Sequence, residues 1–227
     1  QSGYGNVDGY YNSYIGYQAG YSNNGQFNVY IGTNAGSLGT SGDANVILGY
    51  NAGANATGNN NTMIGYGSGS LNSGSENTFL GFESGYLNTT GSSNIFLGYF
   101  SGVNNTEGSN NIFIGPSAGH DNLTGERNVF MGSGAGSKNT TGYENVLLGD
   151  GAGAYNSTGF ANTSIGVSAG ALNNGQRNTF VGYYAGSSGF LATGYANVSV
   201  GEASGAAFTT GSSNTFLGSR AGMTVAE

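Results

Sequence analysis

The chain has 227 residues, of which 46 are Gly, and only 7% of its residues are charged. Globular domains average about 7% Gly and about 25% charged residues, so this composition argues against a helix-rich catalytic domain. The net charge is −7 with four Lys and Arg in total, which leaves no basic patch for nucleic acid or for anionic lipid headgroups. The absence of Cys excludes disulfides and Cys-ligated zinc. We therefore expect a periodic or fibrous protein that neither binds nucleic acid nor inserts into a membrane.

A repeat of about 17 residues, aligned on one Asn, runs through the whole sequence. Positions are counted from this Asn: +2 is the second residue after it and −2 the second residue before it. Gly stands at −3, +4 and +8 of every copy and so accounts for 39 of the 46 Gly. The thirteen copies begin at Asn12, Asn28, Asn45, Asn61, Asn77, Asn94, Asn111, Asn128, Asn145, Asn162, Asn178, Asn197 and Asn214.

This period and Gly placement predict an all-β fold, a parallel β-solenoid of about 13 coils that forms a single repeat domain over residues 1–227. About 17 residues suffice for two short strands and their turns in each coil. The rival fold is a three-sided β-helix of six-residue repeats. That fold should show an aliphatic residue every six positions, whereas here each copy has one apolar strand.

The strand of each copy occupies the positions just after the Asn. Position +1 is Val, Ile or Thr in twelve copies, and position +3 is always aliphatic or Met. Since side chains alternate along a strand, these two positions share one face, which we expect to form the interior of the coil. The residue at +7 is always Ala or Ser, small enough for an interior corner.

Position +2 then points to the opposite face, and it is apolar in eleven copies. A strand that is apolar on both faces is normally buried on both, so we expect this second face to be covered by other copies of the chain at a trimer interface. The predicted interface residues are Tyr14, Tyr30, Ile47, Met63, Phe79, Phe96, Phe113, Phe130, Leu147, Phe180 and Phe216.

The remainder of each copy is rich in Asn, Ser, Thr and Gly, and predicts a polar return on the solvent side. All variation in repeat length falls here, and the longest version, residues 187–194, predicts a local bulge. Stacked copies place Asn above Asn, which predicts an internal amide ladder, although Asn also favours the turn before a strand. Asn55, Asn88, Asn139 and Asn156 begin glycosylation sequons that this composition produces by chance, so glycosylation is not inferred.

The segment Asn-Val-Tyr-Ile-Gly-Thr-Asn-Ala-Gly at 28–36, with Asn-Thr-Phe-Leu-Gly at 77–81 and 214–218, resembles the head repeats of trimeric autotransporter adhesins and of related phage tail fibres and bacterial adhesive fibres. The resemblance covers about residues 9–222. It implies a left-handed parallel β-roll, three chains around a threefold axis, and a role as an extracellular adhesin head or fibre shaft. The unit of about 17 residues is longer than that of typical autotransporter heads, which places the chain nearer to the tail-fibre type.

The sequence offers no catalytic constellation, and we expect no enzyme activity, no cofactor and no metal. The only His, His120, lies beside Asp121 in a polar turn, where a surface pair is the simplest interpretation. The acidic residues lack the Gly-Gly-x-Gly-x-Asp run of calcium-binding β-rolls. They are scattered along the coils at Asp8, Asp43, Asp121, Asp150, Glu76, Glu107, Glu126 and Glu144.

Aromatic residues at +5 are the candidate ligand-binding surface, because rings on consecutive coils would stand about 4.8 Å apart. Such rings could stack on sugars or contact an apolar partner; alternatively, they pack on their neighbours and shield the backbone. The candidates are Tyr17, Tyr50, Tyr66, Phe82, Tyr99 and Tyr183.

Together these features predict a non-enzymatic, homotrimeric segment of an adhesin or fibre, located outside the cell, on the cell surface or in a virion tail fibre. Its expected partners are copies of itself and a glycan or protein on the surface of a host or prey cell. Two alternatives stay open: a self-assembling filament subunit, and a monomeric solenoid that binds polysaccharide or ice.

Overall fold

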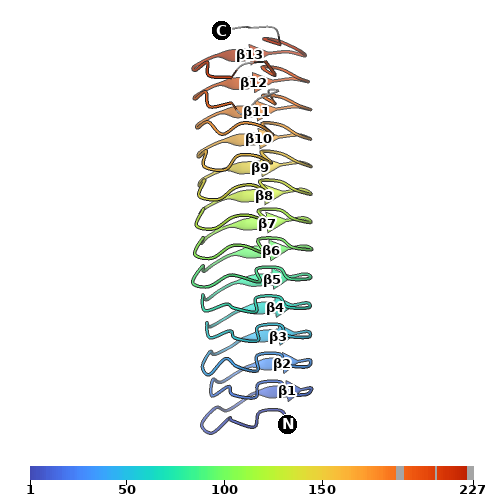
Figure 1. Cartoon of the computed structure of the whole chain (residues 1–227), viewed down its shortest axis with the longest axis vertical. Coiled ribbons are helices and arrows are strands. Elements are labelled where there is room, and N and C mark those ends of the chain that lie inside the picture. Colours follow the sequence, from blue (N-terminus) through green and yellow to red (C-terminus); the bar gives the residue numbers. More distant parts are fainter. Residues whose placement is uncertain (188–191, 208, 224–227) are drawn as a thin grey trace. The chain divides into compact units, whose positions relative to one another are not determined.

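The structure is a computed structural model that describes residues 1–187, 192–207 and 209–223. It divides into two compact units, residues 1–111 and 112–227. In both units each coil contributes one three-residue strand, and consecutive strands pair in parallel (Figure 1). The parallel β-solenoid expected from the repeat is therefore confirmed, whereas the second short strand expected in each coil is not found among the described residues, where each coil has one strand. Part of the predicted bulge at 187–194 lies outside the described residues.

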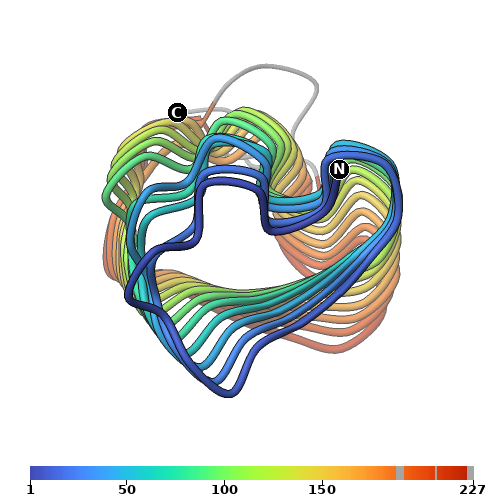
Figure 2. The ribbon, with the colours of Figure 1, turned by 90° about the horizontal axis from the view of Figure 1, so that it is seen from below.

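The strands begin one residue after the repeat Asn throughout. Unit 1 contains β1 (Ser13–Ile15), β2 (Val29–Ile31), β3 (Val46–Leu48), β4 (Thr62–Ile64), β5 (Thr78–Leu80) and β6 (Ile95–Leu97). Unit 2 contains β7 (Ile112–Ile114), β8 (Val129–Met131), β9 (Val146–Leu148), β10 (Thr163–Ile165), β11 (Thr179–Val181), β12 (Val198–Val200) and β13 (Thr215–Leu217). Within each unit the pairing keeps equal repeat positions opposite each other, as in Phe79 with Phe96. Figure 2 shows successive turns of the same outline following one another with a slight rotation.

The middle residue of each strand, at +2, points into its own coil. In β5, for example, Phe79 is fully buried whereas Leu80 is 46% exposed. Core rings stack between coils, with centroids 5.0 Å apart for Phe79 and Phe96 and 4.8 Å apart for Phe113 and Phe130. The core of the solenoid is therefore one column of +2 side chains, together with the buried Ala and Ser at +7.

This arrangement reverses the two faces assigned from the sequence, and the predicted trimer-interface set is wrong. A three-residue strand turns only its middle side chain inward, so the largest apolar residue takes that place, and the residues at +1 and +3 face outward. The residues that belong to the core of a single chain are Tyr14, Tyr30, Ile47, Met63, Phe79, Phe96, Phe113, Phe130, Leu147, Phe180 and Phe216, of which only Tyr14 and Phe216 are partly exposed.

Two of the Gly positions are required by this close packing. The backbone of Gly32, at +4, has φ 131°, and a Cβ added there would lie 2.5 Å from the carbonyl oxygen of Gly49 in the next coil. A Cβ on Gly136, at +8, would lie 2.5 Å from the ring of Phe130. The Gly at +8 thus makes room for the core ring, while the Gly at +4 lets neighbouring coils approach at a corner.

The repeat Asn forms the predicted internal ladder, chiefly with backbone. The Asn77 side chain accepts a hydrogen bond at Oδ1 from the Asn94 backbone N–H (2.9 Å). Its Nδ2 donates to the carbonyl oxygen of Gly91, also in the next coil (2.9 Å). In unit 2, direct amide-to-amide bonds supplement this pattern, as from Asn162 to Asn145 (3.1 Å). Each Asn therefore supplies two of the buried polar contacts that join its coil to the next.

A second Asn column lies at +11, in the segment that the sequence assigned to the solvent side. Asn72, Asn88, Asn105, Asn122, Asn139, Asn156 and Asn173 in this column are all buried. Amide-to-amide bonds join part of this column from coil to coil: Asn88 Nδ2 donates to Asn72 Oδ1 (2.5 Å), Asn105 Nδ2 to Asn88 Oδ1 (2.6 Å) and Asn139 Nδ2 to Asn122 Oδ1 (2.6 Å). The solvent-side prediction is wrong for this column because the narrow coil turns one side of its polar arc inward. Three of the four sequon Asn named in the sequence analysis, Asn88, Asn139 and Asn156, are consequently inaccessible to glycosylation in the folded chain.

At the start of unit 1, Asn23 of the same column forms hydrogen bonds with two core tyrosines. The Tyr14 hydroxyl donates to Asn23 Oδ1 (3.0 Å), and Asn23 Nδ2 donates to the Tyr30 hydroxyl (3.3 Å). Burial raises the pKa of Tyr14 to about 12 and raises the pKa of Tyr30 as well. Both phenols therefore stay protonated at neutral pH and can share the interior with amides.

Replacing one Asn of the internal ladder should weaken the contacts between its coil and the next coil. We expect Asn77→Ala to lower the free energy of unfolding by about 1–3 kcal/mol, because the Asn94 N–H and the Gly91 carbonyl group lose their partner in a buried place. Urea denaturation followed by circular dichroism measures the change. The matched control is Asn55→Ala, which changes an exposed Asn. Equal stability of the two variants would contradict the ladder.

The reversed faces give a second test. Phe79→Ala should cost about 3–5 kcal/mol, because it leaves a cavity in the core column. Leu80→Ala, one residue away on the outer face, should change the stability of the single chain by less than about 1 kcal/mol. Thermal melts at low protein concentration compare the two variants, and the opposite ranking would restore the face assignment made from the sequence.

Candidate functional site

Four of the six aromatic residues at +5 form the predicted ladder on the surface of unit 1. The ring centroids of Tyr50 and Tyr66 are 5.2 Å apart, those of Tyr66 and Phe82 5.0 Å, and those of Phe82 and Tyr99 5.4 Å. All four side chains are exposed. Tyr17 is separated from this ladder by the coil that carries Thr33 at +5.

Tyr183, in unit 2, has no aromatic neighbour at +5 and instead contacts Tyr184 edge to face, at 4.5 Å between centroids. The structure therefore brings together four of the six predicted ligand-binding residues and leaves Tyr17 and Tyr183 apart.

The ladder rings cover each other's faces. Their planes lie within 7° to 23° of parallel, and a spacing near 5 Å leaves no room for a sugar between them. Phe100 packs beside Tyr99, with centroids 4.1 Å apart. The geometry favours mutual packing of the rings over sugar stacking along the ladder, while the ring edges and the phenol hydroxyls face solvent. Ligand binding at these residues stays a prediction.

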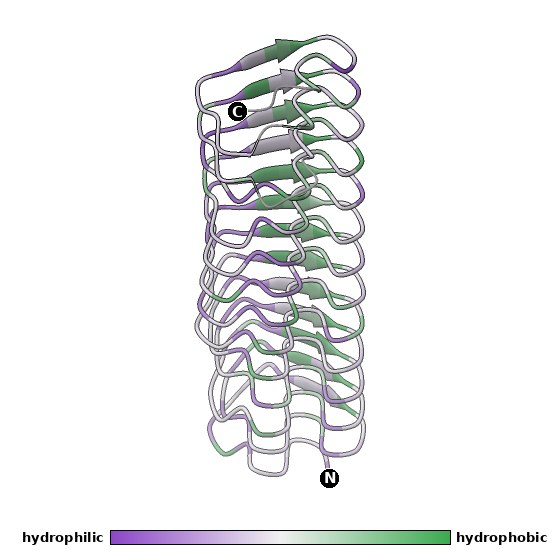
Figure 3. Cartoon of the chain, turned by 45° about the horizontal axis from the view of Figure 1, so that its top comes forward, coloured by the Kyte–Doolittle hydropathy of each residue, from purple (hydrophilic) through white to green (hydrophobic). Residues whose placement is uncertain are grey.

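The second surface feature is the outer sheet face, which we define as the side chains at +1 and +3 of the strands. It carries Val, Ile, Leu, Met and Thr in parallel rows, with Ser13 as the one other residue. Figure 3 shows the hydrophobic colour concentrated on the strands, whereas most of the remaining coil is hydrophilic or neutral. Exposed members include Val46, Leu48, Leu80 and Met131, and none of these positions carries a charge.

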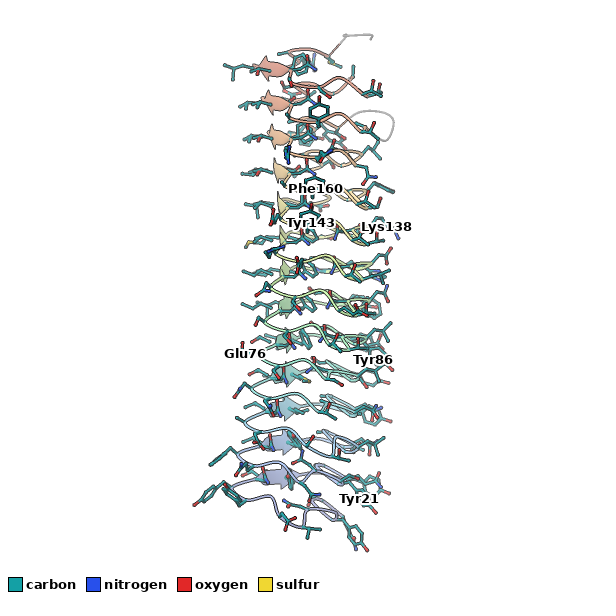
Figure 4. The ribbon with its side chains drawn as sticks, turned by 90° about the vertical axis from the view of Figure 1, so that its left-hand side faces the viewer. Tyr21, Glu76, Tyr86, Lys138, Tyr143 and Phe160 are labelled. Atoms are coloured by element: carbon teal, nitrogen blue, oxygen red, sulfur yellow. The ribbon has the colours of Figure 1, made fainter. Side chains whose placement is uncertain are left out.

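A third feature, absent from the sequence predictions, is an aromatic pair at −2 in unit 2. The rings of Tyr143 and Phe160 stack on successive coils, with centroids 4.8 Å apart and planes within 3° (Figure 4). The Arg177 guanidinium lies 5.9 Å from the centroid of Phe160. The signal in the sequence is the recurrence of aromatic residues at −2, at Tyr10, Tyr143, Phe160 and Tyr195.

The predicted surface pair of His120 and Asp121 exists and includes a third residue. Lys138 Nζ, from the next coil, donates to Asp121 Oδ2 at 2.8 Å, while His120 contacts Asp121 Oδ1. Burial alone would raise the pKa of Asp121, but the hydrogen bonds from Lys138 and His120 outweigh it and hold that pKa below its ordinary value. The cluster is an ion-pair network on the surface of unit 2.

Among the described residues, no group of three or more His, Cys, Asp or Glu side chains is arranged to hold a metal ion. The same residues include no helix with the length and apolar character needed to cross a bilayer. Comparison of the chain with protein-family models, with curated proteins and with solved structures gives no match. The three surface features are therefore the basis for inferring a function.

The ion pair of Asp121 predicts a specific pH dependence. Because the folded pKa lies below the ordinary value of 3.8, the pair stabilises the fold above that value, and the stabilisation is lost as the pH falls through the folded pKa. Lys138→Met should therefore melt at a lower temperature than the parent chain at pH 6, and the difference should vanish in acid. Arg177→Met, which breaks no ion pair given by the structure, is the control; a difference for Lys138→Met that is independent of pH would contradict the assignment.

Proposed function

We propose that the chain is a non-enzymatic segment of an extracellular homotrimeric adhesin or fibre, in which three copies meet through their outer sheet faces. The observation that carries the proposal is this exposed, uncharged, apolar face. The resemblance of the repeats to trimeric adhesins and tail fibres supports the proposal. In this arrangement each copy is a left-handed roll, and the three copies stand around a threefold axis. The surface partner is a glycan or a protein of a host or prey cell.

The size of the outer sheet face supports association. Strands of three residues, about 3.3 Å per residue and about 4.8 Å apart, give each unit a face of roughly 300 Å². Monomeric proteins rarely expose contiguous apolar patches larger than a few hundred Å². The face of each unit reaches this limit, so covering it with other copies removes apolar surface that a monomer rarely leaves in water.

The distribution of charge supports copies of the same chain as the occupant. A chain with a net charge of −7 should repel its own copies, yet the charged side chains of the described residues lie on the turns and polar arcs, and none lies at +1 or +3 of a strand. Parallel copies in register would place equal rows opposite each other, so that apolar residues meet apolar residues without buried charge.

The second candidate is a monomeric solenoid that binds polysaccharide or ice on this same face. The rows include exposed or half-buried Thr at +1, such as Thr62 and Thr78 on adjacent coils, which give a short run of the hydroxyl and methyl groups that this alternative needs. The oligomeric state decides between the two candidates.

Light scattering across a dilution series should give a mass of about three times the 22.8 kDa of one chain. Leu48→Glu combined with Leu80→Glu places carboxylates on the outer sheet face and should yield single chains with an unchanged β-sheet spectrum. Leu38→Glu combined with Leu71→Glu, two exposed leucines outside the strands, is the matched control and should remain trimeric. A parent chain that is monomeric at all concentrations would refute the trimer and favour the second candidate.

A further inference from the structure

A cavity of about 180 Å³ opens on the surface of unit 2, where the polar arcs of three successive coils meet. It is lined by the side chains of Phe160, Thr158, Asn174, Gln176 and Thr193, and by the backbone of two glycines. The lining therefore combines one aromatic ring with amides and hydroxyls and contains no carboxylate.

The aromatic wall of this cavity, the Phe160 ring, has neighbours on both sides, since the Arg177 guanidinium of the next coil lies over the ring. The Tyr143 ring stacks on Phe160 from the preceding coil. The following coil carries Gln176 at the same repeat position, so the aromatic column formed by Tyr143 and Phe160 (Figure 4) ends at Phe160, which lines the cavity together with Gln176. Apolar C–H surface, such as one face of a sugar ring, can pack against such a ring.

Internal hydrogen bonds hold the polar wall in place. The Asn174 Oδ1 atom accepts from the backbone N–H of Thr158 (2.8 Å) and of Gly159 (3.2 Å), and its Nδ2 donates to Thr158 Oγ1 (3.2 Å). In the described part of the chain, the Gln176 amide and the Thr193 hydroxyl make no side-chain hydrogen bond to protein, so both are available to a ligand. A fixed wall with two available polar groups is an arrangement suited to hydroxyl recognition.

A cationic group stands beside the cavity. Of the four basic residues, Arg127 pairs with Glu126 and Glu144, Lys138 with Asp121, and Arg220 with Glu202. Arg177 is the fourth, and within the described residues the structure gives it no carboxylate within 4.0 Å. Its guanidinium instead lies 5.9 Å from the Phe160 ring centroid. An Arg left without an acidic partner, in a chain with a net charge of −7, can bind a carboxylate brought by a ligand.

We propose that this cavity binds an acidic saccharide, namely a sugar ring that carries a carboxylate. The sugar contacts the part of the Phe160 ring that stays accessible beside Arg177, its hydroxyls bond Gln176 and Thr193, and its carboxylate pairs with Arg177. The inference rests on the proposed function only in that it gives the glycan-binding role a ligand class. The site lies within one chain, and a trimer would present three copies that together hold a polymer far more tightly than one.

Isothermal titration with an oligogalacturonate and with a neutral malto-oligosaccharide of equal length tests the proposal. The parent chain should bind the uronate about tenfold or more tightly than the neutral sugar. Arg177→Gln should reduce uronate affinity to the level of the neutral sugar, and Phe160→Leu should weaken both. Arg220→Gln removes an arginine that does not line the cavity, and it should change neither the uronate affinity nor the affinity for the neutral sugar. Circular dichroism verifies that every variant is folded.

Each result decides the proposal. Equal affinity for the two sugars, or a uronate preference that survives in Arg177→Gln, would overturn recognition of the acid. Binding of neither sugar would overturn the site. Light scattering on the same samples separates this failure from that of the proposed function: a trimer that binds no saccharide removes the inference alone, whereas a monomer that binds uronate through Arg177 removes the trimer alone.

Discussion

Hydrogen bonding inside a narrow coil is the constraint on which the rest of the structure depends. A coil of about 17 residues has too little strand to satisfy its buried backbone by sheet pairing, since only three residues per coil belong to a strand. Backbone bonds between the turns of neighbouring coils supply further partners, as from the Gly85 N–H to the Ser101 carbonyl oxygen, and Asn side chains supply others. The repeat Asn bonds an N–H and a carbonyl oxygen of the next coil, and the second column bonds amide to amide. Because these contacts fix the distance between coils, they also set the spacing of the core rings, the outer rows and the surface aromatics.

The sequence was sufficient to predict the solenoid, its period and the position of the strand after each repeat Asn, because Gly and Asn recur at fixed positions, but the return strand that it also predicted is a polar arc of turns in the described residues. It was not sufficient to decide which face of the strand is interior. Leu80 and Phe79 are both apolar, and alternation alone separates them without orienting them. The size of the residue and the Gly at +8 were the available clues, since a ring such as Phe130 fits only where a Gly such as Gly136 makes room for it. The second Asn column escaped prediction because its polar neighbours resemble a solvent-exposed turn.

The candidate sites show a similar division. The ladder from Tyr50 to Tyr99 could be predicted from four consecutive aromatic residues at +5, but the parallel orientation of their planes, which covers the ring faces, depends on side-chain rotamers that no repeat pattern specifies. The cavity beside Phe160 arises where a column changes from aromatic to amide. Such a site depends on a residue that departs from the repeat, so the repeat pattern alone does not predict it.

The register of the coils has a consequence for how such a chain can vary. Every interior position faces its own equivalent in the neighbouring coils, so one copy of the repeat can take the place of another without redesign of the core; the copies that begin at Asn77 and Asn214 even share the same first five residues. Duplication or loss of a whole copy would then lengthen or shorten the solenoid by one step while its hydrogen bonds close again. The outer arc, in contrast, is free to differ from coil to coil. The interior of one coil can thus replace that of another, and differences between coils are confined to the surface.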